Sequence, residues 1–388
     1  MPFYLTPVTG DLLINREKEI EQLLSELTRK NSRIGFSLTG VRRIGKTSIL
    51  KEVKKRLEKQ GIVVIYISVW NTIPDTLETF IANLFDETIT SFKDKFPLKM
   101  KISNLVKMGR SGITDLLKHL NLSVEFEDKI SYTVSYVKGE ESDVSKATSN
   151  IFNLIDKLAE KTKTKCVLII DEFPSLVELK IGKKMIGPSI IKTIRTINED
   201  YTKTSLIISG SFMHTMQQVA LDSSAPFYKQ LVNLEIDSLE DKAIRDFVRK
   251  YLKKKINKEG LESLIEKSSG IPYNLQMLGR QLDNLKEDTL NESSVSKAID
   301  EILKREGDLH FKDYLNMMQS TEIKVVKTMA VYDVNGPKDI GNAGNMRLND
   351  VTALLKILSD KGVVKKIERG QYYFTDNMFK IWLNRTCG

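Results

Sequence analysis

LTGVRRIGKTSIL, residues 38–50, runs from the end of one apolar segment into the start of another, with a glycine-bounded loop between them. Gly40 is followed, after four residues, by Gly45-Lys46-Thr47, which is the full pattern of a phosphate-binding loop. Glycines let the loop turn its backbone N–H groups toward a polyphosphate, and the N-terminus of the next helix adds positive potential. The stretch therefore predicts a strand, a phosphate-binding loop and a helix, in that order.

The residue types in this loop assign a role to its functional groups. Lys46 is expected to reach the β- and γ-phosphates of ATP and to serve in catalysis, and the Thr47 hydroxyl is expected to bind magnesium. The residues predicted to surround the nucleotide here are Gly40, Val41, Arg42, Arg43, Ile44, Gly45, Lys46, Thr47 and Ser48. The alternative is a chance match in a glycine-containing turn, against which the flanking strand and helix patterns argue.

A pair of carboxylates follows a second apolar segment. Asp171 and Glu172 come directly after CVLII, residues 166–170, and open α/β sheets bind ligands at the carboxyl ends of their strands. We expect Asp171 to hold magnesium and Glu172 to orient or deprotonate the water that attacks the γ-phosphate. The alternative is that the two carboxylates only mark the end of an ordinary strand, and the phosphate-binding loop at residues 40–47 argues against it.

A third strand ends in small polar groups, in SLIISGS at residues 205–211. The hydroxyl of Ser209 or of Ser211 could contact the γ-phosphate or the attacking water and so sense the nucleotide, and we take Ser209 as the catalytic candidate. A strand that leaves the core through a turn explains the same residues equally well.

The alternation of apolar strands with amphipathic helices predicts the fold class. Ile20, Leu23 and Leu27 recur at helical spacing before the first strand, and continuous apolar segments such as IVVIYISVW at residues 62–70 indicate buried parallel strands. The sequence therefore predicts an α/β protein with an open parallel sheet of the P-loop NTPase type, a helical lid domain and a C-terminal winged-helix domain.

Changes of pattern divide the chain into three expected domains. Residues 1–238 would form the P-loop ATPase core, residues 239–310 the helical lid domain and residues 311–388 the winged-helix domain. Within the core, a strand period appears after a loosely patterned stretch, so we interpret residues 97–140 as an insertion that carries a β-hairpin. The insertion is either a specificity element or a structural flap.

The last part of the chain has the order of a winged helix, in which three helices precede VVKKIERGQYYF, a hairpin pattern around Arg369. The third helix, from about Leu348, would be the recognition helix. The candidate contacts to duplex DNA are Arg347, Asn349, Thr352 and Lys356 on this helix and Lys365, Lys366 and Arg369 on the wing. Such side chains contact phosphates and base edges. Asp350 and Glu368 dilute the positive charge, and a winged helix can instead hold a protein.

The composition argues against several classes of protein. The chain has 388 residues, a formal net charge of +9, two cysteines and three histidines. Neither a disulfide framework nor a structural zinc site is expected from so few residues without ligand spacing. No apolar run reaches the ~20 residues of a membrane span, and the N-terminal residues lack a signal-peptide order. We expect a cytoplasmic protein whose basic charge permits nucleic-acid binding without requiring it.

Six segments together carry a family resemblance. They are INREKEIEQL (14–23), GVRRIGKTSIL (40–50), VLIIDEF (167–173), LIISGS (206–211), SSGIPYNL (268–275) and YYFTDNMFKIWL (372–383). From about residue 12 to residue 383, the chain resembles the archaeal ATPase family of the AAA+ superfamily. That family is related to the STAND ATPases of signal transduction and, more distantly, to archaeal origin-recognition initiators.

The resemblance implies a five-stranded parallel sheet and a site for the base. The adenine would lie near Ile14, Asn15 and Arg16, and Pro272 of the lid would face it. The Gly-x-Pro segment that contains Pro272 would couple the nucleotide state to the lid, unless it is only a turn between two helices.

An arginine that the family often carries after the sensor strand is missing, because Gln230 occupies its position. This puts in doubt an arginine supplied to a neighbouring subunit's site, and with it efficient hydrolysis in a ring. Arg195 and Arg43 are the substitutes that the sequence offers, although either can be a surface ion pair.

The sequence thus predicts a molecular switch that binds ATP, hydrolyses it slowly and couples the nucleotide state to a winged helix on duplex DNA. The alternatives are a non-hydrolysing, ATP-liganded DNA-binding regulator or initiator, and a signalling scaffold whose winged helix binds protein. The Asp171-Glu172 pair and the long C-terminal part disfavour a small-molecule kinase. The expected partners are ATP or ADP, duplex DNA, and a second copy of the chain or another protein.

Overall fold

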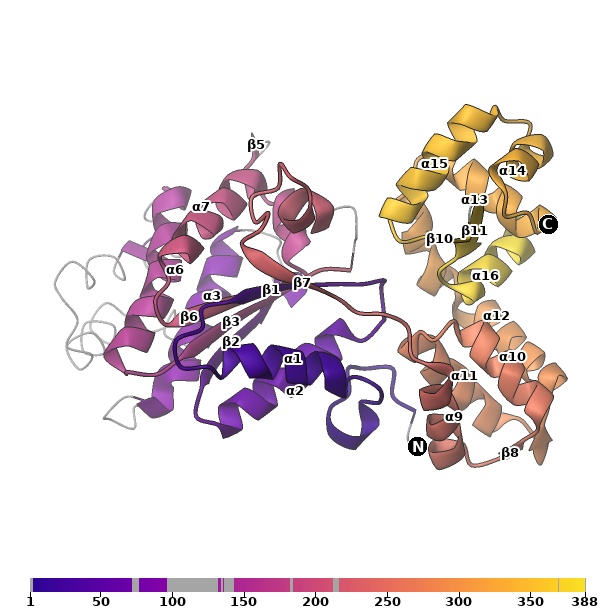
Figure 1. Ribbon diagram of the computed structural model, residues 1–388, viewed down its shortest axis with the longest axis horizontal. Coiled ribbons are helices and arrows are strands. Elements are labelled where there is room, and N and C mark those ends of the chain that lie inside the picture. The colour runs from indigo at the N-terminus through magenta and orange to yellow at the C-terminus, as the bar shows by residue number, and fades with distance from the viewer. Residues whose placement is uncertain are drawn as a thin grey trace.

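The structure is a computed structural model that describes residues 3–71, 77–95, 132–133, 135, 143–181, 184–211, 216–368 and 370–387. Figure 1 shows an N-terminal half built around a sheet and a C-terminal half built mainly of helices, joined by the chain that leaves the sheet after its last strand. None of the helices within the described ranges has the length and apolar character needed to cross a membrane.

A five-stranded parallel sheet forms the centre of the N-terminal half, in the order β2-β3-β6-β1-β7. Its strands are β1 (Gly35–Thr39), β2 (Val63–Ser68), β3 (Cys166–Asp171), β6 (Thr204–Ser209) and β7 (Leu231–Glu235). β6 pairs with β1 on one side and β3 on the other, so the carboxyl ends of these three strands lie side by side at one edge. The five-stranded parallel sheet that the resemblance implies is confirmed.

Helices cover both faces of this sheet. One face carries α1 (Glu17–Leu27) and α2 (Lys46–Lys59), and the other carries α3 (Leu77–Phe92), α6 (Val144–Lys161) and α7 (Gly187–Asp200). Successive residues of a strand enter opposite cores: Ile169 packs with α1 and α2, and Ile170 packs with the other three helices. Burial on both faces explains why the strands are continuously apolar in sequence.

Short elements complete the N-terminal half. They are the helical turns Gly10–Leu12, Val69–Asn71, Lys93–Lys95, Phe173–Glu178 and Gln217–Leu221 and the pair β4 (Lys180–Ile181) and β5 (Lys184–Met185). The β-hairpin predicted within residues 97–140 falls almost wholly outside the described residues. Tyr132, Thr133 and Ser135, where the strand period was expected to continue, are helical.

The C-terminal half begins with four helices, as the pattern of residues 240–305 predicts. Its first elements are α9 (Asp241–Tyr251), β8 (Lys255–Ile256), α10 (Lys258–Ser268), α11 (Pro272–Asn284), β9 (Thr289–Leu290) and α12 (Glu292–Asn316). The Asn257 and Asn291 side chains accept backbone N–H groups at the starts of α10 and α12, and Pro272 opens α11 where no N–H is needed.

Three helices and an antiparallel hairpin follow in the predicted order, and a further helix, which was not predicted, comes after them. They are α13 (Ser320–Tyr332), α14 (Pro337–Gly344), α15 (Leu348–Asp360), β10 (Val364–Glu368), β11 (Gln371–Phe374) and α16 (Asn377–Cys387). β10 and β11 pair with Val364 opposite Phe374. Arg369, at the predicted tip of the wing, lies outside the described residues.

One hydrophobic core joins the two groups of C-terminal helices. It contains Leu278 of α11, Phe311 of α12 and Trp382 of α16, and α12 runs without a break from one group to the other. The expected limit at residue 310 therefore falls inside a helix, where no linker marks it. The division into residues 1–238, 239–310 and 311–388 stays a prediction.

Candidate functional site

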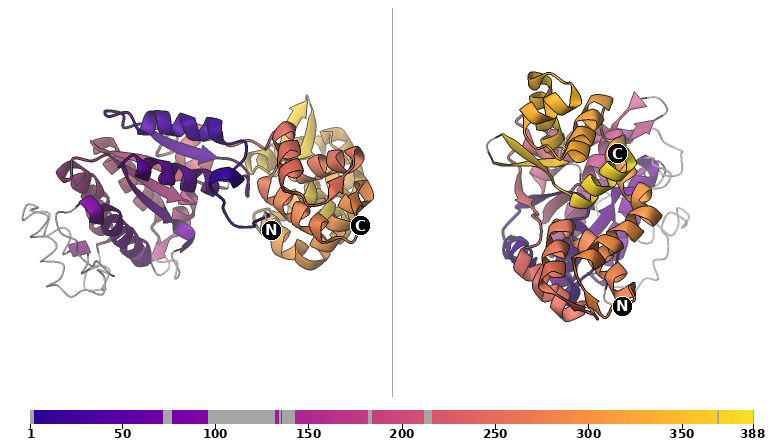
Figure 2. Two further views of the ribbon diagram at one scale, coloured as in Figure 1. Left: turned by 90° about the horizontal axis from the view of Figure 1, so that it is seen from below. Right: turned by 90° about the vertical axis from the view of Figure 1, so that its right-hand side faces the viewer.

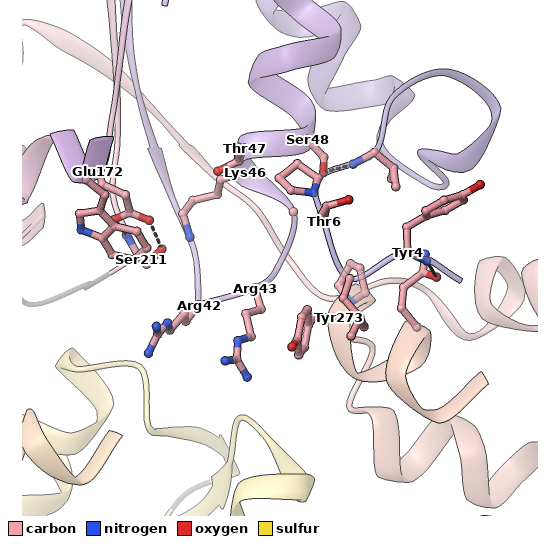
Figure 3. Close-up of a pocket in the computed structure, with 17 residues that line it drawn as sticks. Tyr4, Thr6, Arg42, Arg43, Lys46, Thr47, Ser48, Glu172, Ser211 and Tyr273 are labelled. Atoms are coloured by element: carbon pink, nitrogen blue, oxygen red, sulfur yellow. Dashed lines mark hydrogen bonds between the residues drawn. The ribbon is translucent and has the colours of Figure 1, made fainter. Parts of the chain in front are cut away.

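A cavity of about 310 Å³ lies where the loop after β1 meets the C-terminal half. Figure 3 shows Glu172 and Ser211 at one side of it, Tyr4 and Tyr273 at the other, and Lys46 between them. What we call the carboxylate end is lined by Lys46, Thr47, Glu172 and Ser211. What we call the strap end is lined by Tyr4, Thr6, Pro272 and Gln276.

The loop between β1 and α2 has a backbone shape that depends on its two glycines. Gly40 has φ +147° and Gly45 has φ +103°, values that side chains of L-residues rarely allow. A Cβ on Gly40 would also lie 2.7 Å from the carbonyl oxygen of Ile236, in the chain that leaves β7. The glycines thus fix the loop close to this chain and above the first turn of α2.

Lys46 is the first residue of α2, and its ammonium group lies inside the loop. Its Nζ donates to the carbonyl oxygens of Gly40 at 2.9 Å and Val41 at 3.1 Å. The side chain is buried, and this burial lowers the pKa of Lys46 to about 8, although the carboxylates of Glu172 and Asp171 act in the opposite direction. A cation held only by neutral acceptors is available to a negatively charged ligand.

Asp171 ends β3 and accepts four hydrogen bonds. Thr47 Oγ1 donates to its Oδ2 at 2.8 Å and Tyr66 Oη donates to the same oxygen at 2.7 Å. The Ser209 hydroxyl and the Glu172 backbone N–H donate to Oδ1. Ser209 was predicted to contact the nucleotide, but its buried hydroxyl is used by Asp171, because β6 ends directly beside β3. The sequence reasoning missed Tyr66, which faces Asp171 from the neighbouring strand β2.

Glu172 turns away from β3 with its backbone in the left-handed region, at φ +55°. Ser211 donates to both of its carboxylate oxygens, from Oγ at 2.7 Å and from its backbone N–H at 3.2 Å. Burial raises the pKa of Glu172, while the hydrogen bonds from Ser211 and the charge of Lys46 act in the opposite direction. A carboxylate with a raised pKa at the wall of a cavity is suited to take a proton from water near neutral pH.

Ile14, Arg16 and Pro272, the predicted surroundings of the base, line a second cavity of about 40 Å³. The two cavities share Val8, Gly45, Ser48, Pro272 and Gln276. The buried guanidinium of Arg16 donates to the carbonyl oxygens of Ile44 at 3.1 Å and Asp237 at 2.8 Å. Arg16 therefore ties the loop to the chain after β7, and its buried Nε has no hydrogen-bond partner among the described residues. Its expected contact with the base stays a prediction.

Residues 3–10, which we call the strap, form a wall of the cavity that no motif in the sequence indicates. At one end Phe3 packs edge-on against Phe247 of α9, with ring centroids 5.9 Å apart. At the other end the Val8 N–H donates to Ser48 Oγ of α2 at 3.1 Å. The strap thus crosses from the C-terminal half to the N-terminal half, and Figure 2 shows the N-terminus beside the C-terminal helices.

Arg43 connects the loop to two helices of the C-terminal half. Its guanidinium lies 4.3 Å from the centroid of the Tyr273 ring in α11, and its Nη2 lies 3.2 Å from His310 Nδ1 in α12. Because arginine only donates, His310 Nδ1 is the acceptor and its Nε2–H donates to Glu306 at 3.0 Å. Sequence reasoning did not identify His310, and only the structure reveals its contact with the loop.

The arginines considered for a neighbour's site have partners within the chain. Arg195 of α7 forms an ion pair with Glu199 at 2.8 Å, and Gln230 donates to the same carboxylate at 2.8 Å. Arg43 is held by Tyr273 and His310 as described above. Both arginines are therefore engaged by partners within the described part of the chain.

A groove of about 580 Å³ lies between α15 and the hairpin of β10 and β11. Its walls are formed by Asn349, Thr352, Ala353, Lys356, Ser359, Asp360, Lys366 and Tyr372. Asn349, Thr352, Lys356 and Lys366 were predicted as DNA contacts, so the structure brings these four together. Arg347 precedes α15 and Lys365 lies on β10, both exposed and outside the groove walls.

The oxygen atoms at the carboxylate end suit magnesium. The Thr47 hydroxyl and the Asp171 carboxylate are 2.8 Å apart, and magnesium in nucleotide sites uses one or two protein oxygens together with water and phosphate oxygens. Among the residues that the structure describes, no group of three or more His, Cys, Asp or Glu side chains could hold a metal. The donor set therefore fits a magnesium ion that arrives with a phosphate ligand.

Comparison with solved structures shows the fold. A Walker-type ATPase of Pyrococcus abyssi superimposes with a TM-score of 0.68 at 17% identity, over 99% of both chains. The ORC2 protein of Aeropyrum pernix, solved as ADPNP-ADP complexes, gives a TM-score of 0.61 at 14% identity, over 100% of this chain and 96% of that one. The predicted fold class of a P-loop NTPase sheet followed by a helical region is confirmed.

Sequence comparison shows the family. An uncharacterized protein of Methanocaldococcus jannaschii is 25% identical over 278 residues, which cover 69% of this chain and 55% of that protein. An uncharacterized ATP-binding protein of the same organism is 29% identical over 172 residues, or 43% of this chain and 44% of that one. The chain thus spans about half the length of the relatives that it matches. A family model described as an ATPase domain predominantly from Archaea matches residues 13–278, so the chain belongs to this ATPase family, as its sequence motifs predict.

Proposed function

We propose that the protein binds magnesium-ATP in the 310 Å³ cavity and hydrolyses it slowly to ADP. One observation carries this proposal: Lys46, Thr47 and Glu172 line the same cavity, and Asp171 bonds to Thr47 directly behind it. These four residues come from two segments more than 120 positions apart in the sequence. Their convergence at the edge of a parallel sheet is what phosphoryl transfer by a P-loop protein requires.

Magnesium would be held by Thr47 and Asp171, and when bound it would neutralise charge on the β- and γ-phosphates. The ammonium of Lys46 would leave the carbonyl oxygens of Gly40 and Val41 for the more strongly accepting phosphates. The Glu172 carboxylate, oriented by Ser211, would hold the attacking water and accept its proton.

Nucleotide binding would be communicated to the C-terminal half through Arg43. This loop residue contacts Tyr273 and His310, and the neighbouring Val41 faces the turn after α15, where a Cβ on Gly362 would lie 3.6 Å from the Val41 side chain. A loop that rearranges around phosphates would alter both contacts. This proposed coupling makes the protein a switch.

The switch would act on duplex DNA, which would bind in the groove between α15 and the hairpin. Most residues that line the groove have polar side chains, and Lys356 and Lys366 place positive charge on both sides of it, while Asp360 adds one negative charge. A helix and a hairpin that flank a polar groove offer contacts to base edges and to phosphates. As a test, Lys356→Glu with Lys366→Glu should abolish a salt-sensitive DNA complex, whereas Lys324→Glu on α13, outside the groove walls, should not.

A protein partner is the second candidate for this surface. Leu348, which is 51% exposed, begins α15, and Ile367, which is 58% exposed, projects from β10. Exposed apolar side chains favour a protein surface over a phosphate backbone. Binding that is insensitive to salt and is lost in Ile367→Lys would support this candidate over DNA.

The experiment for the central proposal is phosphate release from magnesium-ATP by the wild type and Glu172→Gln, with and without duplex DNA and at several protein concentrations. Glu178→Gln is the matched control, because Glu178 is exposed in the helical turn after β3. We expect turnover that needs Glu172, and a rise with protein concentration would indicate a site completed by a second copy. ATP binding without turnover under every condition would instead support an ATP-liganded regulator.

A further inference from the structure

Gln276 of α11 is a polar side chain in the apolar part of the site that the proposed reaction does not use. It is 7% exposed and lines both the 310 Å³ cavity and the adjoining 40 Å³ cavity. It lies four residues after Pro272, so the two side chains project from the same face of α11. Gln276 therefore lies at the junction of the two cavities, where it would contact a ligand that extends from one into the other.

The strap fixes which half of the Gln276 amide faces the ligand. The backbone N–H of Tyr4 donates to Gln276 Oε1 at 3.1 Å. With the oxygen engaged, the side chain offers its Nε2 amino group, which only donates. Within the described part of the chain, this amino group makes no hydrogen bond with protein, although the side chain lines both cavities. A donor at a cavity wall without a protein acceptor can pair with an acceptor on a ligand.

Packing of the strap makes this orientation a fixed one. Phe3, next to Tyr4, lies so close to Gly279 that a Cβ there would be 2.2 Å from the Phe3 ring. Gly279 is one turn beyond Gln276 on α11, so the same helix holds both the ring and the amide. The amide is therefore preorganised before a ligand arrives.

The surroundings of the amide suit a flat heterocycle. Most of the side chains that line the small cavity are apolar, among them Val8, Leu13, Ile14, Pro272 and Leu275, and Arg16 and Ser48 line it as well. Apolar walls favour an aromatic ring, and the donor of Gln276 would pair with a ring nitrogen that carries a lone pair. Adenine has three such nitrogens.

We propose that Gln276 is a base-reading residue, whose Nε2 donates to a ring nitrogen of the adenine while the strap holds its Oε1. This inference rests on the proposed function, because it assumes that the triphosphate lies at the carboxylate end. It adds a specificity contact that neither the loop nor the residues around Ile14 provide.

The test compares the dissociation constants of magnesium-ATP and magnesium-tripolyphosphate for the full chain. Gln276→Leu removes both halves of the amide, and Gln276→Glu keeps an oxygen for the Tyr4 N–H while removing the donor. Both variants should weaken ATP binding about 3- to 10-fold and leave tripolyphosphate unchanged. Gln281→Leu, on the same helix but outside both cavities, is the matched control. Each of 1-deaza-, 3-deaza- and 7-deaza-ATP lacks one ring nitrogen of adenine. The analogue that lacks the nitrogen bound by Gln276 should bind the wild type as weakly as ATP binds Gln276→Glu.

The two hypotheses fail in different ways. If the wild type binds ATP in a Lys46-dependent manner and Gln276→Glu binds it equally well, or if all three deaza analogues bind like ATP, the role of Gln276 is overturned and the proposed function stands. If the wild type binds neither ATP nor tripolyphosphate, the proposed function fails and the inference fails with it. Unfolding curves of the variants show whether the strap remains in place.

Discussion

The two ends of the cavity are built in different ways. The carboxylate end is polar, and its residues come from the loop after β1 and from the ends of adjacent strands. The strap end is assembled from residues 3–14, which cross between the two halves of the molecule, and from α11 of the C-terminal half. One end therefore depends on local motifs within a rigid sheet, and the other depends on how the two halves meet.

The largest effect should come from the carboxylate end, in Lys46→Ala. Losing the ammonium removes the cation that would hold the phosphates, so the affinity for both ATP and tripolyphosphate should fall by about 100-fold or more. Calorimetric titration measures this, with Lys51→Ala on the exposed face of α2 as the control. Unchanged affinity for tripolyphosphate would mean that the phosphates bind elsewhere.

Arg16→Leu should produce the next largest effect, this time on folding stability. The substitution leaves the carbonyl oxygens of Ile44 and Asp237 without their buried donor, so the free energy of unfolding should fall by about 2–4 kcal/mol. Urea unfolding without nucleotide measures it, and Arg29→Leu, at an exposed position two residues after the end of α1, is the control. Equal stability of Arg16→Leu and the wild type would contradict the positioning role of Arg16.

Ser211→Ala should change the pH dependence of turnover. Burial raises the pKa of Glu172, and the hydrogen bond from the Ser211 hydroxyl opposes that rise, so its removal should raise the pKa further. If Glu172 accepts a proton, the rate falls as pH decreases through this pKa, and the acid limb of the profile should move to higher pH. The loss of turnover should therefore be larger at acidic pH and smaller at alkaline pH. Ser189→Ala, exposed on α7, serves as the control, and an acid limb that does not move would contradict the role of Ser211.

Tyr66→Phe should have the smallest effect. Asp171 Oδ2 would lose one of its two donors and keep Thr47, so stability should fall by about 1 kcal/mol and turnover by less than about threefold. Parallel unfolding and phosphate-release assays separate the two effects. A tenfold loss of turnover at unchanged stability would place Tyr66 among the residues that act on the substrate.

The sequence predicted the carboxylate end well, for a physical reason. Gly40, Gly45, Lys46 and Thr47 are contiguous or nearly so, and the positive φ that the loop needs requires glycine at both ends. Asp171 follows an apolar strand, and parallel strands bring their carboxyl ends together. Ser209 is the exception, because the pairing of β6 beside β3 directs its hydroxyl to Asp171, which strand periodicity alone does not reveal.

The strap end was mostly beyond prediction, because its contacts join segments far apart in the sequence. Nothing near Tyr4 indicates that its backbone would meet Gln276, and nothing near Arg43 indicates His310. One signal was present in the sequence. The resemblance places Pro272 against the base, and Gln276 follows Pro272 at helical spacing, so its side chain is expected on the same face of the helix. Arg16 was identified as important, but the carbonyl oxygens that it binds come from the tertiary fold.

The unbroken course of α12 has a mechanical consequence. Its 25 residues span about 37 Å, and they belong to one core from end to end. His310, which meets the loop, lies toward the end of this rod nearest α13. A tilt of about 10° about the Glu292 end would displace His310 by about 5 Å and the α13 end by about 6 Å. The C-terminal half would then move as one body, in which a displacement of His310 by the loop is passed on at similar size to α15 and the hairpin.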